Sequence, residues 1–131
     1  MGISYYAKAG YGIVLTAEEN ARIDEERTYE DWYDTEDFAL VESGSYYSGE
    51  ISRVIFVKPY FSEDVNYWSG IEEWPLIASV EDMAKFSDNI LLYFVEKLDY
   101  SAEELSQGRS VGEVKESLAA RIKFVFTMLV S

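Results

Sequence analysis

The fold of this chain is most constrained by the order in which strand-like and helix-like patterns follow one another. Residues 38–42 and 51–58 are rich in β-branched and aromatic side chains, which predicts two strands joined as a long-looped hairpin. We expect Pro59 to end the second strand, because proline cannot donate to a strand ladder. From Ser79 to Leu98 the apolar residues recur at steps of three and four, which predicts a helix packed on the core.

The N-terminal part of the chain adds a strand and a helix. Residues 3–15 alternate like a strand, with glycines at 10 and 12, so they form either one bulged strand or a tight hairpin. Thr16 followed by Glu19 is a capping-box pattern, which predicts a short, charged helix that ends near residue 26.

The C-terminal part admits two readings. Ser101 and Ser110 have the spacing of helix caps, which predicts two short helices. Beyond them, residues 111–130 fit helical spacing over most of their length, while residues 122–130 also alternate as a strand would. We expect a helix to about residue 120 and then a strand, because the last segment is β-branched and aromatic; one long helix is the alternative.

The resulting order, strand, helix, strand, strand, helix, strand, predicts a single α+β domain over residues 1–131, with a mixed or antiparallel sheet packed by helices. This βαββαβ order is that of ferredoxin-like sandwiches. A different α+β meander with helices on one face fits the same elements.

Composition excludes several classes of function. The chain of 131 residues contains no cysteine and no histidine, so thiol nucleophiles, thiolate metal sites and histidine-based acid–base catalysis are absent. Phosphate-binding glycine motifs and a calcium-loop motif are also missing. We therefore expect no cofactor and no dedicated metal site, and lean towards a protein that is not an enzyme. No signal peptide or membrane-spanning run is seen, so a cytoplasmic location is expected.

The negative charge of the chain is concentrated in its middle. Residues 18–82 hold eighteen acidic and four basic side chains, and so account for the whole net charge of −14. All three tryptophans, at positions 32, 68 and 74, lie inside this acidic pole. Such a surface suits a basic partner, because the field raises encounter rates while aromatic rings anchor the complex. It repels nucleic acid and anionic membranes, so we expect neither as a direct partner.

The leading hypothesis is a non-enzymatic protein that binds a basic protein surface. That surface could belong to a nucleic-acid-binding enzyme, which the acidic protein would inhibit as a nucleic-acid mimic, in the manner of small phage proteins. The expected partner-binding residues combine the tryptophans with neighbouring acids: Asp31, Trp32, Asp34, Glu36, Asp37, Glu63, Asp64, Trp68, Glu72, Glu73 and Trp74.

Three alternatives remain open. The acidic pole is a solvated face with no partner. The protein is a small-molecule or sugar-binding or catalytic domain, in which case Glu72 or Asp64 should lie buried in a cleft. It is an oligomeric structural or assembly protein that uses residues 124–130 as an uncovered strand. For the pairs Tyr5–Tyr6 and Tyr46–Tyr47, strand alternation predicts one core and one surface ring each.

Overall fold

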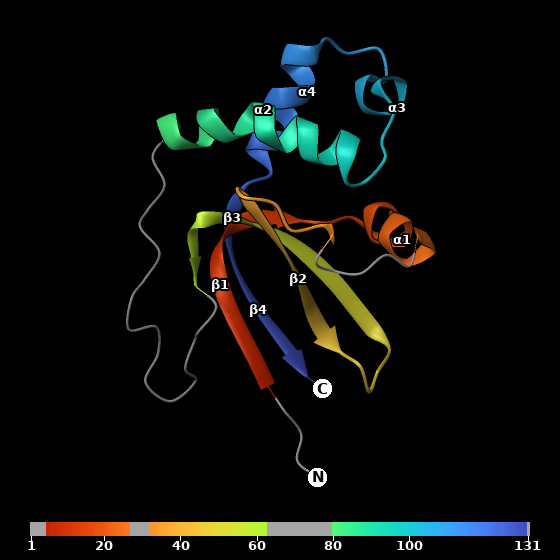
Figure 1. Cartoon of the computed structure of the whole chain (residues 1–131), viewed down its shortest axis with the longest axis vertical. Helices are drawn as coiled ribbons and strands as arrows, with labels where there is room; N and C mark the ends of the chain where they lie inside the picture. The colour runs from red at the N-terminus through yellow and green to blue at the C-terminus, as the bar shows by residue number, and fades with distance from the viewer. Residues whose placement is uncertain (1–4, 27–31, 63–79, 131) are drawn as a thin grey trace.

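A computed structural model describes residues 5–26, 32–62 and 80–130 of the chain (Figure 1). The described elements follow the predicted order, and the two short helices predicted after Ser101 and Ser110 are both present. They are β1 (Tyr5–Val14), α1 (Ala17–Glu26), β2 (Phe38–Ser45), β3 (Glu50–Ser62), α2 (Val80–Glu96), α3 (Ala102–Ser106), α4 (Val111–Ala120) and β4 (Lys123–Val130).

The strands close into a barrel in the order β1-β3-β2-β4. Three of its ladders are antiparallel, and the fourth joins β2 to β4 in parallel through two residue pairs, Gly44–Leu129 and Ser45–Val130. Helices α2, α3 and α4 gather beyond one end of the barrel, while β1 begins and β4 ends near the other (Figure 1). The α+β class is confirmed, but the ferredoxin-like arrangement is not what the chain adopts, because its sheet is closed.

The bend in β1 explains the closure. This strand pairs with β4 from Tyr5 to Gly12 and with β3 from Ala9 to Val14, and its register with β3 shifts between Gly10 and Gly12. A Cβ atom on Gly10 would lie 2.3 Å from the Tyr60 carbonyl oxygen, and one on Gly12 only 2.4 Å from that of Ile55. The glycines are therefore needed for space, since the backbone of β3 passes directly against them.

The structure decides one open alternative about the strands and shows that one prediction is wrong. The N-terminal segment is one irregular strand, not a hairpin. The second hairpin strand does not end at Pro59 but continues to Ser62. Pro59 is tolerated because it lies where the β1–β3 register shifts, and proline within a sheet is found at such irregularities.

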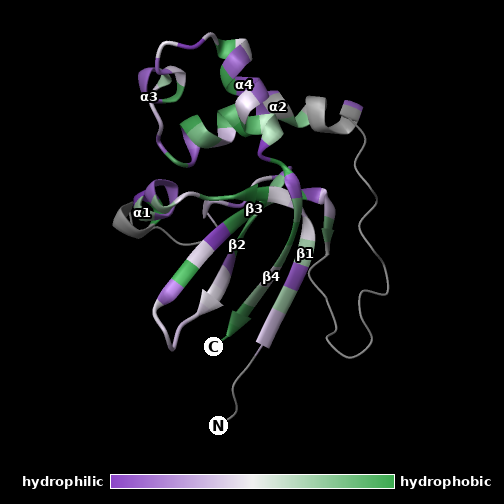
Figure 2. Cartoon of the chain, turned by 180° about the vertical axis from the view of Figure 1, so that it is seen from behind, coloured by the Kyte–Doolittle hydropathy of each residue, from purple (hydrophilic) through white to green (hydrophobic). Residues whose placement is uncertain are grey.

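The apolar side chains form two clusters on opposite faces of the sheet. Inside the barrel lie Val41, Val54 and Phe56, with Phe61 and Val125 packed against them. The larger cluster fills the space between the sheet and the helices, and its buried residues include Phe38, Ile55, Ile90, Phe94 and Leu118. Figure 2 shows the hydrophobic residues that α2 and α4 contribute to it.

The predicted helix starts and the C-terminal strand are confirmed. Thr16 and Glu19 form the reciprocal capping box of α1, Ser101 forms one for α3 and Ser110 caps α4. Residues 111–130 are a helix followed by a strand. In the described part of the chain, no helix has the length and apolar character needed to cross a membrane.

The prediction for the tyrosine pairs is wrong, because all four rings are exposed. Tyr46 and Tyr47 lie in the turn between β2 and β3, where strand alternation does not apply. Tyr5 and Tyr6 begin β1, far from the helices that cover the other end of the sheet (Figure 1).

Candidate interaction groove

A concave surface of about 170 Å³ lies between residues 35–38 and one face of α2. We call it the acidic groove, because three of its lining residues are carboxylates, Glu36, Asp37 and Glu96, and one, Lys97, is a cation. The remaining lining residues are Thr35, Phe38, Asn89, Leu92 and Tyr93.

The first wall of the acidic groove is a turn held by its own side chains. The Thr35 hydroxyl accepts a hydrogen bond from the Phe38 amide at 3.0 Å, and the Thr35 amide donates to the Phe38 carbonyl at 2.9 Å. The Asp34 carboxylate accepts from the amide of Leu40 at 2.9 Å. The bonds to the Thr35 hydroxyl are typical of Ser/Thr turns, and the bond from Leu40 to Asp34 holds the turn against β2.

The second wall is the outer face of α2. Asn89 donates from its amide to Asp37 at 3.3 Å, which ties the two walls together. Leu92 and Glu96 are exposed on the same helix face, since residues three and four apart lie next to one another on a helix. The groove therefore joins an exposed apolar side chain to carboxylates from two elements.

Trp32 adjoins the acidic groove through Lys97. The ammonium group of Lys97 lies 4.4 Å from the centre of the Trp32 ring, within the range of a cation–π interaction. The buried ring of Tyr33 packs edge-on against Trp32 at 5.0 Å between centroids. Trp32 still exposes 44% of its surface, so it is held by its neighbours and remains accessible from solvent.

Tyr93 forms the buried floor of the acidic groove. Burial and the nearby charge of Asp34 raise the pKa of its hydroxyl well above the ordinary tyrosine value, because both disfavour the phenolate. Within the part of the chain that is described, this hydroxyl has no hydrogen-bond partner. It is therefore a neutral donor and acceptor.

The predicted binding residues are placed only in part. Trp32, Glu36 and Asp37 lie on or beside the acidic groove, and Asp34 is exposed next to it while also bonding to the backbone. The other predicted residues fall outside the described part: Asp31, Glu63, Asp64, Trp68, Glu72, Glu73 and Trp74. The α2 residues Asn89, Leu92 and Glu96 were missed, although their spacing of three and four places them on one helix face.

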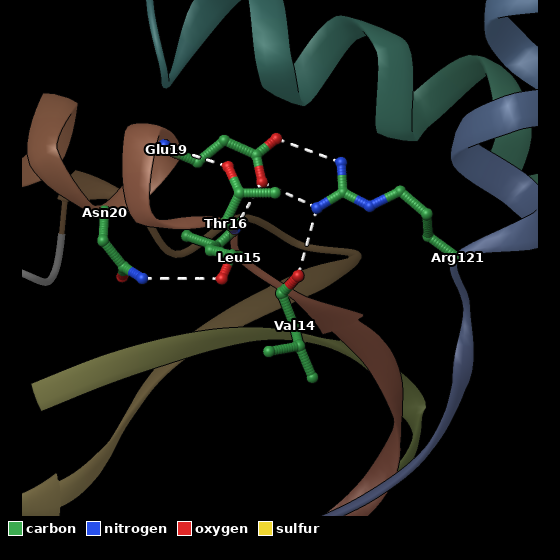
Figure 3. A network of polar contacts seen from close by, with 6 residues as sticks. All are labelled: Val14, Leu15, Thr16, Glu19, Asn20 and Arg121. Atoms are coloured by element: carbon green, nitrogen blue, oxygen red, sulfur yellow. Dashed lines mark hydrogen bonds and ion pairs between the residues drawn. The ribbon is translucent and has the colours of Figure 1, made fainter.

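A second, larger cleft of about 310 Å³ lies among α1, α3 and α4. Its central feature is Glu19, only 6% exposed, which accepts two hydrogen bonds from Arg121 at 2.6 and 3.0 Å. Arg121 also donates to the carbonyl of Val14 at 3.1 Å. Figure 3 shows how this network ties the end of β1 and the start of α1 to the residue that ends α4.

Two of the three carboxylates that line this cleft, those of Glu19 and Glu104, are paired with cations of the protein, while the third belongs to Glu18. Burial by itself would raise the pKa of Glu19, but the hydrogen bonds from Arg121 and Thr16, with the charge of Arg121, hold it below its ordinary value. On the opposite wall Glu104 pairs with Arg22, whose guanidinium also stacks 3.6 Å from the centre of the Tyr100 ring. The cleft thus looks like a structural junction. The expected catalytic cleft around Asp64 or Glu72 concerns residues outside the described ranges.

Within residues 5–26, 32–62 and 80–130, no three acidic side chains are placed to share a metal ion. Comparison with known proteins finds no match: no family model fits the sequence, and no curated protein or solved structure is significantly similar. The fold and the groove define a small α+β protein, a closed four-stranded barrel with helices at one end and an acidic, aromatic groove on one of them.

Proposed function

We propose that this protein binds a basic segment of another protein in the acidic groove. The observation that carries the proposal is the position of Trp32, a half-exposed tryptophan beside a concave surface with three carboxylates. Tryptophan and arginine are the residues most enriched at the energetic centres of interfaces. A partner arginine or lysine would find a ring face, an apolar contact at Leu92 and opposite charge within one surface.

The carboxylates of the groove are available to such a partner. Asp37 is held by a neutral amide, that of Asn89, and neither Glu36 nor Glu96 forms an ion pair with another residue of the described ranges. With Lys97, the lining carries a net charge of −2. Because the chain as a whole carries −14, its field also attracts a basic partner from a distance.

The position of Lys97 supports this proposal, because its side chain resembles the cationic side chain that a partner would place in the groove. Its ammonium already lies over the Trp32 ring, in the position that a partner cation would take. A flexible lysine is easily displaced by an arginine, whose planar guanidinium stacks better on an aromatic face. We infer that binding exchanges Lys97 for a cationic side chain of the partner.

The test uses a fluorescein-labelled peptide of alternating arginine and serine. A protein of this charge attracts any polycation, so the deciding measurement is a comparison of variants by fluorescence anisotropy. Trp32→Ala should weaken binding by about tenfold, the usual cost of losing an interface anchor. Tyr47→Ala, which removes a more exposed ring in the β2–β3 turn, should leave the affinity unchanged. Equal effects of the two substitutions would refute the groove as the binding site.

Salt gives a second criterion. Binding should weaken steeply as NaCl rises from about 0.05 to about 0.5 M, because screening shortens the reach of the field. Affinity that does not respond to salt would contradict a charge-driven complex.

We further propose that the natural partner is a protein whose basic surface holds nucleic acid, with the carboxylates occupying the place of phosphates. The net charge, and the three carboxylates that two segments bring to one groove, support this choice. The immobilised protein should retain proteins from a nuclease-treated lysate that duplex DNA then elutes, since both compete for one surface. Retained proteins that DNA does not elute would argue against mimicry.

A further inference from the structure

The outer face of the β1–β4 ladder carries no charged side chain. Side chains alternate across a strand, and those of Val125 and Thr127 belong to the inside of the barrel or are buried. The opposite face is therefore made by four directly paired positions. We call it the uncharged face: Tyr5–Val130, Ala7–Met128, Ala9–Phe126 and Tyr11–Phe124.

The uncharged face continues the sheet surface that the helices cover elsewhere. Ile13, on the same side of β1, belongs to the core beneath the helices. Tyr11 contacts Tyr60, and Tyr60 contacts Phe86 of α2, so this row of rings marks the margin of the helical cover. Beyond it, Phe124, Phe126 and Tyr5 are 41%, 51% and 63% exposed. An exposed sheet face is normally polar, and a contiguous apolar patch marks an interaction site.

The face has a shape that suits a second copy of itself. On β4 it carries the larger side chains of Phe126 and Met128, while their partners on β1 are the small residues Ala9 and Ala7. Under a two-fold axis the same patch meets itself. The β4 ridge of one copy would then lie over Ala7 of the other, since Ala9 is already fully buried within each copy.

Charge selects the face through which two copies can meet. Two molecules of net charge −14 repel one another, so they can approach most closely where carboxylates are absent. Lys8 and Lys123 are the charged residues of β1 and β4, and no acid lies on either strand. We propose that the protein forms a symmetric dimer through the uncharged face. The acidic groove lies on α2, at the helical end (Figure 1), so each copy keeps its groove free.

The test is the oligomeric state by sedimentation equilibrium over a range of protein concentrations. Phe126→Glu should weaken self-association by about tenfold or more, because it buries a charge in an apolar contact. Val111→Glu is the matched control, since it makes the same kind of change at a side chain of α4 that is 62% exposed. Tyr5→Glu, at the far end of the face, should act like Phe126→Glu if the latter variant folds poorly, and circular dichroism checks the fold of each.

Salt dependence separates this surface from the acidic groove. Dimerisation should strengthen as NaCl increases, because screening removes the repulsion between copies while the apolar contact remains. A monomer at all concentrations and salt levels would overturn the proposal. So would a dimer that Phe126→Glu and Tyr5→Glu leave intact, or one that Val111→Glu disrupts equally. None of these outcomes bears on peptide binding in the groove.

Discussion

The acidic groove and the Glu19 cleft are both concave, and both combine carboxylates, cations and aromatic rings, yet their charges are arranged differently. In the cleft, Glu19 pairs with Arg121 and Glu104 with Arg22. In the groove, three carboxylates face the single ammonium of Lys97, which lies on a tryptophan ring. Matched charges hold elements of the fold together, whereas unmatched charges remain available to a partner.

This difference could not be seen in the sequence, where the acids of both regions look alike. Glu19 was counted with the acidic pole, but its carboxylate is buried and bonded, so it contributes little to any outward-facing surface. The acidity that a partner meets is smaller than the number of acidic residues implies. The following predictions separate the two kinds of carboxylate.

The largest effect is expected from Arg121→Met. It should lower the free energy of unfolding by about 3 kcal/mol, because it leaves the buried carboxylate of Glu19 without its cation. Adding Glu19→Gln should restore much of the loss, since glutamine still caps Thr16 and carries no charge. Urea denaturation at neutral pH measures both.

Arg109→Met is the control for that experiment, because the Arg109 guanidinium donates to carbonyls of α3 and pairs with no carboxylate in the described residues. It should change stability by less than about 1 kcal/mol. Arg121→Met alone and Arg121→Met combined with Glu19→Gln could lower the free energy of unfolding by the same amount. In that case the packing of Arg121 over Phe94, and not its charge, stabilises the junction.

The next effect concerns the groove. The double substitution Glu36→Gln and Asp37→Asn should weaken binding of the arginine peptide by about tenfold, because it removes two of three carboxylates. Stability should change by no more than about 1 kcal/mol, because Glu36 is exposed and an asparagine at position 37 can still accept the hydrogen bond from Asn89. Glu19→Gln should do the reverse, lowering stability and leaving peptide affinity intact. Affinity lost through Glu19→Gln would erase the distinction between the two regions.

A smaller effect should appear with pH. Because the pKa of Glu19 is lower in the folded protein than its ordinary value of 4.5, the stabilisation from its charge is fully present above that value. It is lost as the pH falls through the folded pKa. The difference in unfolding free energy between the wild type and Glu19→Gln should therefore be constant from about pH 8 to about pH 5 and shrink below. If this difference in unfolding free energy grew as the pH fell, the result would contradict an ion pair between Glu19 and Arg121.

The smallest effect is expected from Lys97→Gln. Removing the ammonium frees the Trp32 ring and makes the groove more negative, so the arginine peptide should bind about two- to fivefold more tightly, in line with the strength of an exposed cation–π contact. Lys115→Gln, which removes a lysine paired with Asp88, is the control. Titration by fluorescence anisotropy detects a change of this size, and unchanged affinity would show that Lys97 does not occupy the binding position.

Much of the secondary structure could be predicted from local patterns. The capping boxes at Thr16 and Ser101, and the change from helix to strand near residue 120, were all readable, because each depends on neighbours within a few residues. Closure of the barrel was not readable, since it depends on the contact of Gly10 and Gly12 with the backbone of β3, some 45 residues away along the chain.

Only one wall of the acidic groove could be predicted from the sequence. Trp32, Glu36 and Asp37 stand close together in the sequence, so composition pointed to them. Leu92 and Glu96 come from a helix more than 50 residues later, and it takes the contacts of Asn89 with Asp37 and of Lys97 with Trp32 to show that the two segments meet. The ion pair with Arg121 also removes the carboxylate of Glu19 from the surface. No local sequence pattern identifies Arg121, about 100 residues away, as its partner.

The parallel contact between β2 and β4 has a consequence for the motions of the barrel. It consists of two residue pairs, together with the bond from the Tyr46 amide to the Val130 carbonyl, while the β1–β4 ladder extends over eight pairs. Local opening follows the weakest ladder. Separation along this line turns the cylinder into a curved sheet and admits water to Val41 and Phe56, with every other ladder intact. The amide proton of Tyr46 is therefore expected to exchange with solvent well before those in the middle of β3.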